Sequence, residues 1–347
     1  MRKVNLICLG ILMIGMLFSG CGYEKVQENT QVGYEKIENH EFDNALAAFD
    51  VAQEKKENPR MIARGKGIAS IGLTDYKSAV SYFKEALSYS DVWVDALDYD
   101  LNYYMALSYE KMGDYKNTID TYSSIIALSP KDGLAYCNRG SAYLLLGEHD
   151  YAIKDFDKAL SLDKDNYDLR IEIAGKLSEA SYESDGNKYL NDLLSEDKKL
   201  SEFDTGRIYY YMKDYEKAKV HLEKARDNGD ADTILFLGKT YEKLGDFNYA
   251  TSVYQNYLNK HQDSAFIYNQ LGLCKINAKD AQGARDAFKT AQGIENNGMN
   301  QALEFNEIVA NEYLGDFKQA SVLMMAYCKK YPDDQDALRE NIFLKTR

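Results

Sequence analysis

The sequence predicts an all-α protein, a solenoid of about nine helix pairs followed by one further helix. One observation behind this prediction is the scarcity of proline, with 3 Pro in 347 residues, where average usage of about 5% would give roughly 17. Because proline is excluded from helix interiors, its scarcity favours helices. A second observation is internal repetition, in which a small residue followed four positions later by Phe or Tyr returns about every 34 residues.

The repeated pair occurs along almost the whole chain. Its clear copies are Ala45/Phe49, Ala79/Phe83, Ala152/Phe156, Ala250/Tyr254 and Ala284/Phe288, and its softer copies are Thr118/Tyr122, Ala218/Leu222 and Ala320/Met324. Apolar residues at spacings of three and four around each pair indicate two amphipathic helices per unit. A single unit cannot bury its apolar faces, so neighbouring units are expected to stack.

A shared framework surrounds these pairs. The segments 106–115, 139–149 and 237–247 align with one another, and each carries a small residue, then Tyr, then Gly followed by Asp or Glu. This framework resembles the tetratricopeptide repeat, whose pattern is W-x₂-L-G-x₂-Y, then A-x₃-F, with a 34-residue period. The resemblance covers residues 26–334 and implies a superhelical array, although no unit has the leading Trp.

Two places depart from the repeat pattern. An insertion around 89–100, which carries Trp93, separates the second and third units. The fifth unit, about 167–198, lacks the Ala/Phe pair, so its helix pairing is left open. After Pro332, residues 335–347 are expected to form a capping helix whose polar outer side keeps the array soluble.

The N-terminus reads as an export signal. Arg2 and Lys3 precede an apolar stretch that is too short to span a bilayer, which needs about 20 residues, and Ser19-Gly20 supplies small residues. Residues 1–20 resemble the signal peptide of bacterial lipoproteins, which implies cleavage and lipidation at Cys21, with Phe18 where Leu is usual. Residues 21–30 then form the lipidated Cys and a short linker. An uncleaved anchor and an ordinary signal peptide are the alternatives.

Composition narrows the class of function. The net charge of −13 disfavours binding to nucleic acid. The four histidines show no metal-ligand spacing, and the sequence has no P-loop, dinucleotide-binding or nucleophile-elbow motif. We therefore predict no metal, no cofactor and no enzymatic activity.

Function is expected on the concave surface that the resemblance assigns to the first helix of each unit. Tetratricopeptide arrays generally bind peptide segments of other proteins there, and aromatic anchors commonly dominate such binding. Transferred to this chain, the candidate binding residues are Tyr103, Phe203, Arg207, Tyr210, Tyr211, Leu235, Lys239, Phe266, Asn269, Phe305 and Tyr313. Packing between repeats is the alternative role for each of these side chains.

The sequence thus predicts an extracytoplasmic, lipid-anchored scaffold for an unidentified protein of the cell envelope, held to the membrane through Cys21. One alternative is a component of envelope assembly or secretion machinery, of the barrel-assembly or pilus-biogenesis type. Others are an enzyme or glycan binder that uses the irregular fifth unit, and a simple structural spacer.

Overall fold

The computed structural model describes residues 27–346 except 91–93, 196–199, 296 and 333. Within this part of the chain it contains nineteen α-helices, one 3₁₀ turn at Arg226–Asn228, and no strand. The prediction of an all-α helical repeat fold is confirmed. The predicted signal segment 1–20, Cys21 and Trp93 lie outside the described residues.

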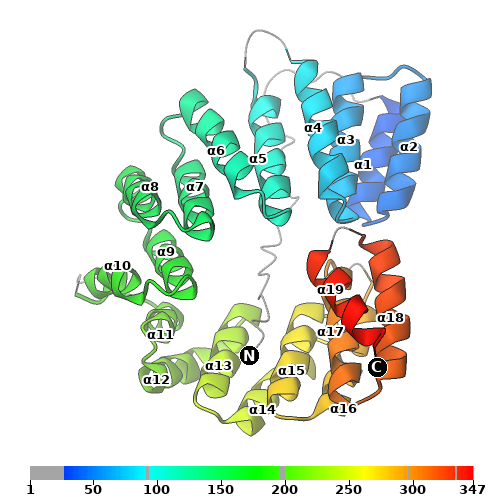
Figure 1. Ribbon diagram of the computed structural model, residues 1–347. Coiled ribbons are helices and arrows are strands. Elements are labelled where there is room, and N and C mark those ends of the chain that lie inside the picture. The colour runs from blue at the N-terminus through cyan, green and yellow to red at the C-terminus, as the bar shows by residue number, and fades with distance from the viewer. Residues whose placement is uncertain (1–26, 91–93, 196–199, 296, 333, 347) are drawn as a thin grey trace. The chain divides into compact units, whose positions relative to one another are not determined.

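Eighteen of the described helices alternate along the chain as the first and second helices of nine repeat units (Figure 1). In eight of these units, all except α5 with α6, the two helices are in contact with each other. The first helices of the pairs are α1 (Glu28–Glu38), α3 (Pro59–Gly72), α5 (Ala96–Lys111), α7 (Gly133–Leu146), α9 (Tyr167–Glu179), α11 (Glu202–Tyr211), α13 (Ala231–Lys243), α15 (Ala265–Asn277) and α17 (Asn300–Tyr313). The second helices are α2 (Phe42–Glu54), α4 (Tyr76–Ser88), α6 (Tyr115–Leu128), α8 (His149–Leu162), α10 (Glu183–Ser195), α12 (Tyr215–Ala225), α14 (Phe247–Leu258), α16 (Ala281–Gln292) and α18 (Phe317–Lys330). Helix α19 (Gln335–Leu344) follows the last pair.

The chain divides into two compact units, with the boundary inside α5. Unit 1 ends at Ser108 and contains α1–α4, each packed against the next in sequence, and the start of α5. Unit 2 begins at Tyr109 and contains α6–α19, again with successive helices packed together.

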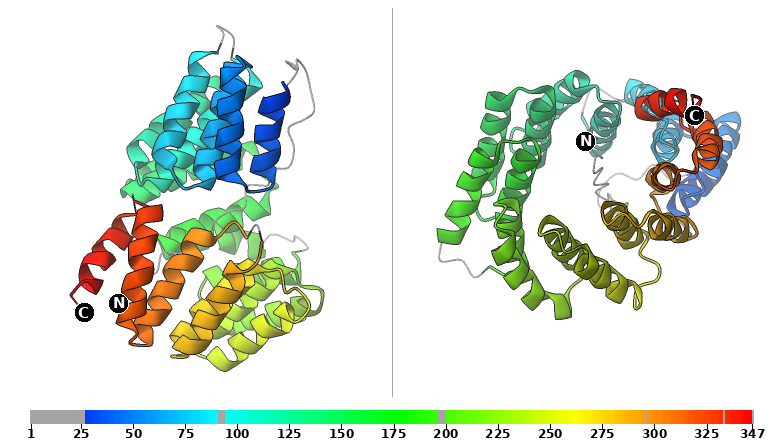
Figure 2. Two further views of the ribbon diagram at one scale, coloured as in Figure 1. Left: turned by 90° about the vertical axis from the view of Figure 1, so that its right-hand side faces the viewer. Right: turned by 60° about the horizontal axis from the view of Figure 1, so that its bottom comes forward.

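Within unit 2 the first helices lie side by side. Helix α7 contacts α9, and the contacts continue from α9 to α11, α13, α15 and α17 in turn. The second helices α8, α10, α12 and α14 all lie on one side of this row, as Figure 1 and the right-hand view of Figure 2 show. One side of the row of first helices is therefore left uncovered by second helices.

Each pair turns through one residue with left-handed backbone. These nine turn residues are His40, Thr74, Gly113, Gly147, Ser181, Lys213, Gly245, Lys279 and Gly315. Glycine was expected only at four of them, and the other five adopt positive φ despite a side chain, which costs of order 1 kcal/mol each. The next residue is often Asp, and its carboxylate caps the second helix, as Asp246 does for the Tyr249 amide at 3.0 Å.

The fifth repeat is a helix pair like the others. Helices α9 and α10 pack together around the turn residue Ser181. Gly186 and the fully buried Leu190 stand five and nine residues after this turn, where repeat four has Ala152 and Phe156. The expected Ala/Phe pair is thus replaced by Gly/Leu, and the pairing that the sequence left open is present.

In several pairs the two helices approach so closely that only a small residue fits between them. A methyl group at Gly238 of α13 would lie 2.2 Å from Cζ of Tyr254 on α14, and one at Gly272 would lie 2.3 Å from Phe288. Both rings are fully buried. The predicted column of small residues and the predicted column of large residues are therefore two sides of one contact.

In unit 1, the Glu57 side chain connects the segment between α2 and α3 to the first turn of α1. This carboxylate, between α2 and α3, accepts hydrogen bonds from the backbone amides of Asn29 (3.2 Å) and Thr30 (2.8 Å) and from the Thr30 hydroxyl (2.6 Å). It thereby caps α1, whose own N-cap residue Gln27 makes no side-chain cap. Burial would raise the pKa of Glu57, but these bonds outweigh it and lower the pKa to about 2.

Gly238→Ala is expected to lower the free energy of unfolding by about 2 kcal/mol, because the methyl group overlaps the buried Tyr254 ring. This loss exceeds the gain of about 1 kcal/mol that Ala has over Gly in a helix. Urea unfolding measures it. The matched control is Gly133→Ala, where the added methyl group would lie 3.6 Å from its nearest neighbour, the carbonyl oxygen of Ala159. Equal losses of stability in the two variants would contradict the close contact as the cause.

Glu57 predicts a specific loss of stability in acid. Its folded pKa of about 2 lies below the ordinary value of 4.5, so its stabilisation is complete above about pH 4.5 and is lost as the pH falls toward about 2. Glu57→Gln should lower the free energy of unfolding at neutral pH by about 2 kcal/mol and flatten the pH dependence in that window. Thermal unfolding of this variant and of Glu38→Gln, an exposed position on α1, would reveal the difference; identical pH profiles would refute the capping role.

Candidate protein-binding surface

The uncovered side of the first helices in unit 2 forms a continuous surface, which we term the inner face. Its residues stand six and two positions before each turn residue, one helical turn apart. They are Ser141 and Leu145 on α7, Gly175 and Glu179 on α9, Arg207 and Tyr211 on α11, Lys239 and Lys243 on α13, Leu273 and Asn277 on α15, and Val309 and Tyr313 on α17. The second member is exposed on every helix except α11, where Tyr211 is half-buried.

An aromatic cluster interrupts the inner face at α11 and α13. The ring of Phe236 lies 5.3 Å from Tyr210, 5.7 Å from Tyr211 and 5.9 Å from Phe203, measured between centroids and with the rings edge to face. Tyr210 also contacts Tyr215 at 5.6 Å. Edge-to-face pairs at these distances are favourable, so Phe236 is the centre of the cluster.

Arg207 connects three successive first helices. Its guanidinium carbon lies 5.2 Å from the ring centre of Phe203 on α11 and 5.8 Å from that of Phe236 on α13. Its Nη1 contacts Asp168 on α9 at 2.9 Å and Asp204 on α11 at 3.3 Å. This side chain is therefore held by the protein itself, through two rings and two carboxylates.

Tyr211 extends the aromatic surface onto the preceding repeat. A methyl group at Gly175 of α9 would lie 2.8 Å from Cζ of Tyr211. The ring therefore lies directly against the backbone of α9, and the absence of a side chain at Gly175 makes this position possible. Phe236, Tyr211 and Gly175 thus form one continuous apolar strip across α13, α11 and α9.

Beside this strip, α13 carries a carboxylate held by neighbouring helices. Glu242 accepts hydrogen bonds from the Tyr254 hydroxyl (2.9 Å) and the Asn277 amide (3.4 Å). Burial raises the pKa of Glu242, and the two hydrogen bonds oppose that rise. Burial also raises the pKa of the Tyr210 hydroxyl, so both groups lie in a poorly hydrated part of the surface.

The C-terminal part of the inner face is amphipathic. Asn306 on α17 donates a hydrogen bond to Asn269 on α15 at 2.8 Å. Phe266 on α15 and Phe305 on α17 are half-buried, each at the edge of a different apolar cluster. Tyr313 is 66% exposed at the end of α17. Of the predicted aromatic residues, Tyr313 is therefore the one most open to a partner.

The structure places the predicted binding residues in three environments. Phe203, Arg207, Tyr210, Tyr211, Lys239, Phe266 and Phe305 are half-buried on the first helices of unit 2, and Tyr313 is exposed. Leu235 and Asn269 are buried, at 7% and 5% exposure, and Leu235 belongs to the apolar core between repeats. Tyr103 lies on the part of α5 that belongs to unit 1, and Cys21 is outside the described residues.

Sequence reasoning missed two residues of this surface. Phe236 follows Leu235 directly and lies at the centre of the aromatic cluster, and Leu145 on α7 is 54% exposed. An aromatic residue next to a predicted binding position was a usable signal for Phe236. Leu145 had a weaker signal, because a leucine in an amphipathic helix is usually assigned to the core.

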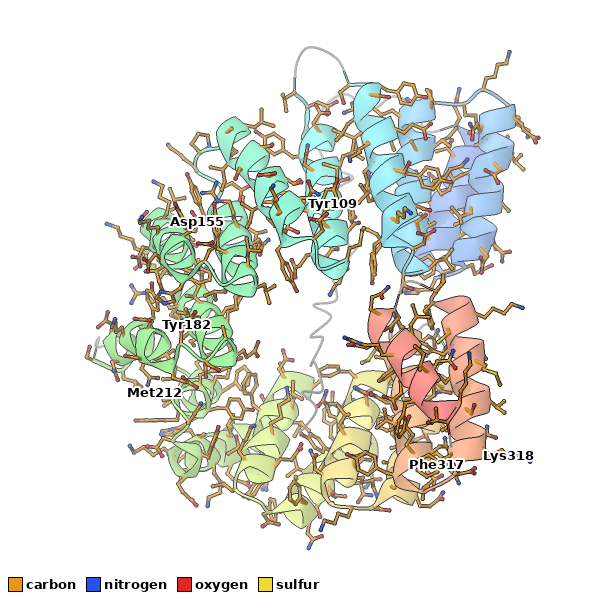
Figure 3. All side chains as sticks on the ribbon, viewed as in Figure 1. Tyr109, Asp155, Tyr182, Met212, Phe317 and Lys318 are labelled. Carbon is orange, nitrogen blue, oxygen red and sulfur yellow. The ribbon has the colours of Figure 1, made fainter. Side chains whose placement is uncertain are left out.

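Two buried thiols are unreactive, and one imidazole has a structural role. Burial raises the pKa of the Cys137 and Cys274 thiols to about 12, so both are protonated and inert at neutral pH. His149 packs on Tyr182, the residue directly before α10, which is labelled in Figure 3. The two ring centres lie 4.3 Å apart, and Nε2 of His149 lies 3.0 Å from Asp185. That histidine therefore joins the fourth repeat to the fifth.

Metal binding and membrane crossing find no support in the described part of the chain. No group of three or more His, Cys, Asp or Glu side chains there is arranged to hold a metal ion. Among the same residues, none of the helices has the length and apolar character needed to cross a membrane.

Comparison with known families identifies the repeated unit. Residues 100–132, 133–166 and 205–225 each match a family described as tetratricopeptide repeat. The match over 133–166 spans α7 and α8 with the turn between them. The chain thus carries tetratricopeptide repeats, as its sequence pattern indicated.

Relatives with this repeat are distant. The chain is 25% identical over 248 residues to the TPR repeat-containing protein MJ1428 of Methanocaldococcus jannaschii, covering 67% of this chain and 42% of that protein. It is 25% identical over 170 residues to the BBSome complex member bbs-4 of Caenorhabditis elegans, covering 49% of this chain and 32% of that protein. The chain thus spans about a third to two fifths of these relatives.

A solved tetratricopeptide repeat protein from Parabacteroides merdae is 15% identical to this chain. Their superposition covers 73% of this chain and 98% of that one, with a TM-score of 0.46.

Arg207→Met is expected to lower the free energy of unfolding by about 2 kcal/mol, because it leaves the nearly buried Asp204 carboxylate without its cation. Arg207→Lys should lie between this variant and the wild type, since an ammonium cannot stack between the two rings as a guanidinium does. Urea unfolding measures both. Arg226→Met removes an arginine whose side chain is 42% exposed and should change stability by less than about 0.5 kcal/mol; a comparable loss there would contradict the role given to Arg207.

Proposed function

We propose that this protein is an exported, lipid-anchored scaffold that binds a segment of another protein on the inner face of unit 2. The tetratricopeptide repeats support a role in protein–protein interaction. The location at the cell envelope rests on the N-terminal sequence, in which an apolar stretch and small residues precede Cys21.

The aromatic strip formed by Phe236, Tyr211 and Gly175 carries the proposal for the binding site. Large rings that are half-buried on an uncovered surface offer apolar area to a partner at little entropic cost, since they are already held by their neighbours. Arg207 fixes two of the rings of the adjoining cluster in place. The partner segment is expected to seat its own apolar side chain on this strip.

A binding role, and not catalysis, fits the chemistry of the described residues. The buried thiols are protonated at neutral pH, and the Glu242 carboxylate beside the aromatic strip is engaged in a structural contact with Tyr254. We therefore propose a scaffold without enzymatic activity and without a cofactor.

Photo-crosslinking in the native cells tests the binding surface. A crosslinking amino acid placed at Lys243 or Tyr313, both exposed on the inner face, should capture the same protein. The same probe at Tyr151 or Tyr249, exposed on second helices α8 and α14, should not. Capture of one protein with equal yield from both pairs of positions would refute the placement.

Loss of the aromatic strip should abolish that capture. Tyr211→Ala combined with Phe236→Ala is expected to reduce crosslinking at Lys243 at least tenfold, because two anchoring side chains are removed. Leu145→Asp, which alters an exposed residue of the inner face outside the aromatic cluster, should reduce it less. Circular dichroism of the purified variants confirms that the helices persist, and unchanged crosslinking in a folded double variant would place the site elsewhere.

The lipid anchor is tested separately. Metabolic labelling with a clickable fatty acid should mark the wild-type protein, and Cys21→Ser should abolish the label, because the cysteine sulfur is the atom to which the lipid is attached in the lipoproteins whose signal residues 1–20 resemble. The variant should also leave the membrane fraction. A labelled Cys21→Ser protein would disprove lipidation at this residue, whatever the outcome of the crosslinking.

A further inference from the structure

A hollow lies between two successive second helices of unit 2. Residues of α6, α7 and α8 line it, and it encloses about 370 Å³. Sites for small ligands commonly measure about 300–1,000 Å³, so the hollow has room for one large side chain of a partner. None of its lining residues belongs to the inner face, so a molecule bound here would leave the inner face free.

The apolar part of the hollow is partly open to solvent. The rings of Tyr143 on α7 and Tyr151 on α8 are stacked, with centres 5.3 Å apart and planes 26° apart. Tyr151 is 53% exposed, and Leu146, the last residue of α7, is 49% exposed. Large apolar side chains that remain exposed together beside a hollow are typical of interaction sites.

Three charged groups surround these apolar side chains. Lys116 and Asp120 come from α6, and Glu148 follows the turn directly before α8. All three side chains are exposed, and none forms a hydrogen bond or an ion pair with another residue in the described part of the chain. Two carboxylates and one ammonium give the hollow a net negative charge, and both carboxylates lack a donor from the protein.

The seventh repeat shows a group that binds such a tyrosine pair. Its tyrosines, Tyr241 and Tyr249, occupy the same two positions relative to the turn, with ring centres 4.3 Å apart. The hydroxyl of Tyr241 donates to Glu223 at 2.6 Å. Arg226 pairs with Glu223 at 2.7 Å and donates from Nη1 to the Tyr249 hydroxyl at 3.4 Å. In this repeat a guanidinium held by a carboxylate thus lies beside the pair.

The tyrosine pair of the fourth repeat has no such arginine. Counted from the turn of the preceding repeat, the positions of that carboxylate and that arginine are taken by Ser123 and Ile126. Arg139 of α7 is held by both oxygens of Asp155 and does not line the hollow. The fourth repeat therefore combines a tyrosine pair with two carboxylates but supplies no guanidinium to the hollow.

We propose that the hollow binds an arginine side chain of a second partner protein. The guanidinium would donate to Asp120 and Glu148 together, because its planar fork of donors can reach two carboxylates at once. Its methylene stem would lie along Leu146 and the ring of Tyr151. This site is additional to the one proposed on the inner face, and with both occupied the chain would hold two proteins together.

Other ligand classes fit the hollow less well. An anionic ligand would meet two carboxylates and one ammonium. A sugar ring would need an open aromatic face, whereas Tyr143 and Tyr151 cover each other and Nζ of Lys154 lies 5.4 Å from the ring centre of Tyr151. A second copy of the chain is disfavoured by electrostatic repulsion, since the chain carries a net charge of −13.

A peptide with one arginine between two leucines tests the site. The probe is fluorescein-labelled Gly-Ser-Leu-Arg-Leu-Ser-Gly, and its anisotropy with the purified full-length protein at low salt should show saturable binding. Asp120→Asn combined with Glu148→Gln should weaken this binding at least tenfold, because both charge-assisted acceptors are lost. Glu54→Gln combined with Asp192→Asn removes the same charge at exposed positions outside the hollow and should change binding less than twofold.

Lys116→Glu provides a readout in the opposite direction. It removes the ammonium from the hollow and adds a carboxylate, so binding of the arginine peptide should strengthen at least threefold. Replacing the arginine of the peptide by lysine should weaken binding at least threefold, because an ammonium has no planar fork to bridge two carboxylates. Tyr211→Ala combined with Phe236→Ala should leave this binding unchanged, which separates the hollow from the site on the inner face.

Unfolding curves should show that each variant is folded. The proposal would be overturned by a lack of saturable binding, by equal weakening in the two carboxylate double variants, or by equal binding of the lysine peptide. Unchanged or weaker binding to folded Lys116→Glu would also overturn it. So would a dimer in sedimentation that Asp120→Asn combined with Glu148→Gln dissociates, because the hollow would then belong to a contact between copies of the chain.

Discussion

The close crossing of the two helices within most repeats determines how neighbouring repeats pack. A glycine on the first helix lies against a ring or a leucine of the second, as Gly238 lies against Tyr254 and Gly206 lies against Leu222. The pair then behaves as one rigid block with a large buried side chain at its centre. Stacking such blocks brings successive first helices into contact in unit 2, which creates the inner face.

The same packing also determines which side chains of the first helices lie on the inner face. Because each first helix of unit 2 is covered by two second helices, only one strip of it remains open. The side chains on that strip do not have to pack in the apolar core. At Gly175, which has no side chain, the ring of Tyr211 from the next repeat packs against the helix. Arg207 adds a polar connection across α9, α11 and α13. The same residues thus pack neighbouring repeats together and form the proposed binding surface.

The sequence was sufficient for the helix pairs and their number, because small and large residues recur at a fixed period. It was less informative at the fifth repeat, where Gly186 and Leu190 satisfy the same packing with unexpected residues. It also assigned Leu235 and Asn269 to the surface, whereas both are buried. Both residues stand ten positions before their turn residues, whereas the inner-face residues stand six and two positions before them.

Glu57 has a mechanical consequence. Its carboxylate joins the start of α1 to the connection between α2 and α3 through bonds to Asn29 and Thr30. A force applied to the chain ahead of Gln27 would therefore be transmitted directly to the second repeat, and several charge-assisted bonds would have to break together before α1 could peel away. The first repeat is reinforced against pulling at the end where an anchored chain would be loaded.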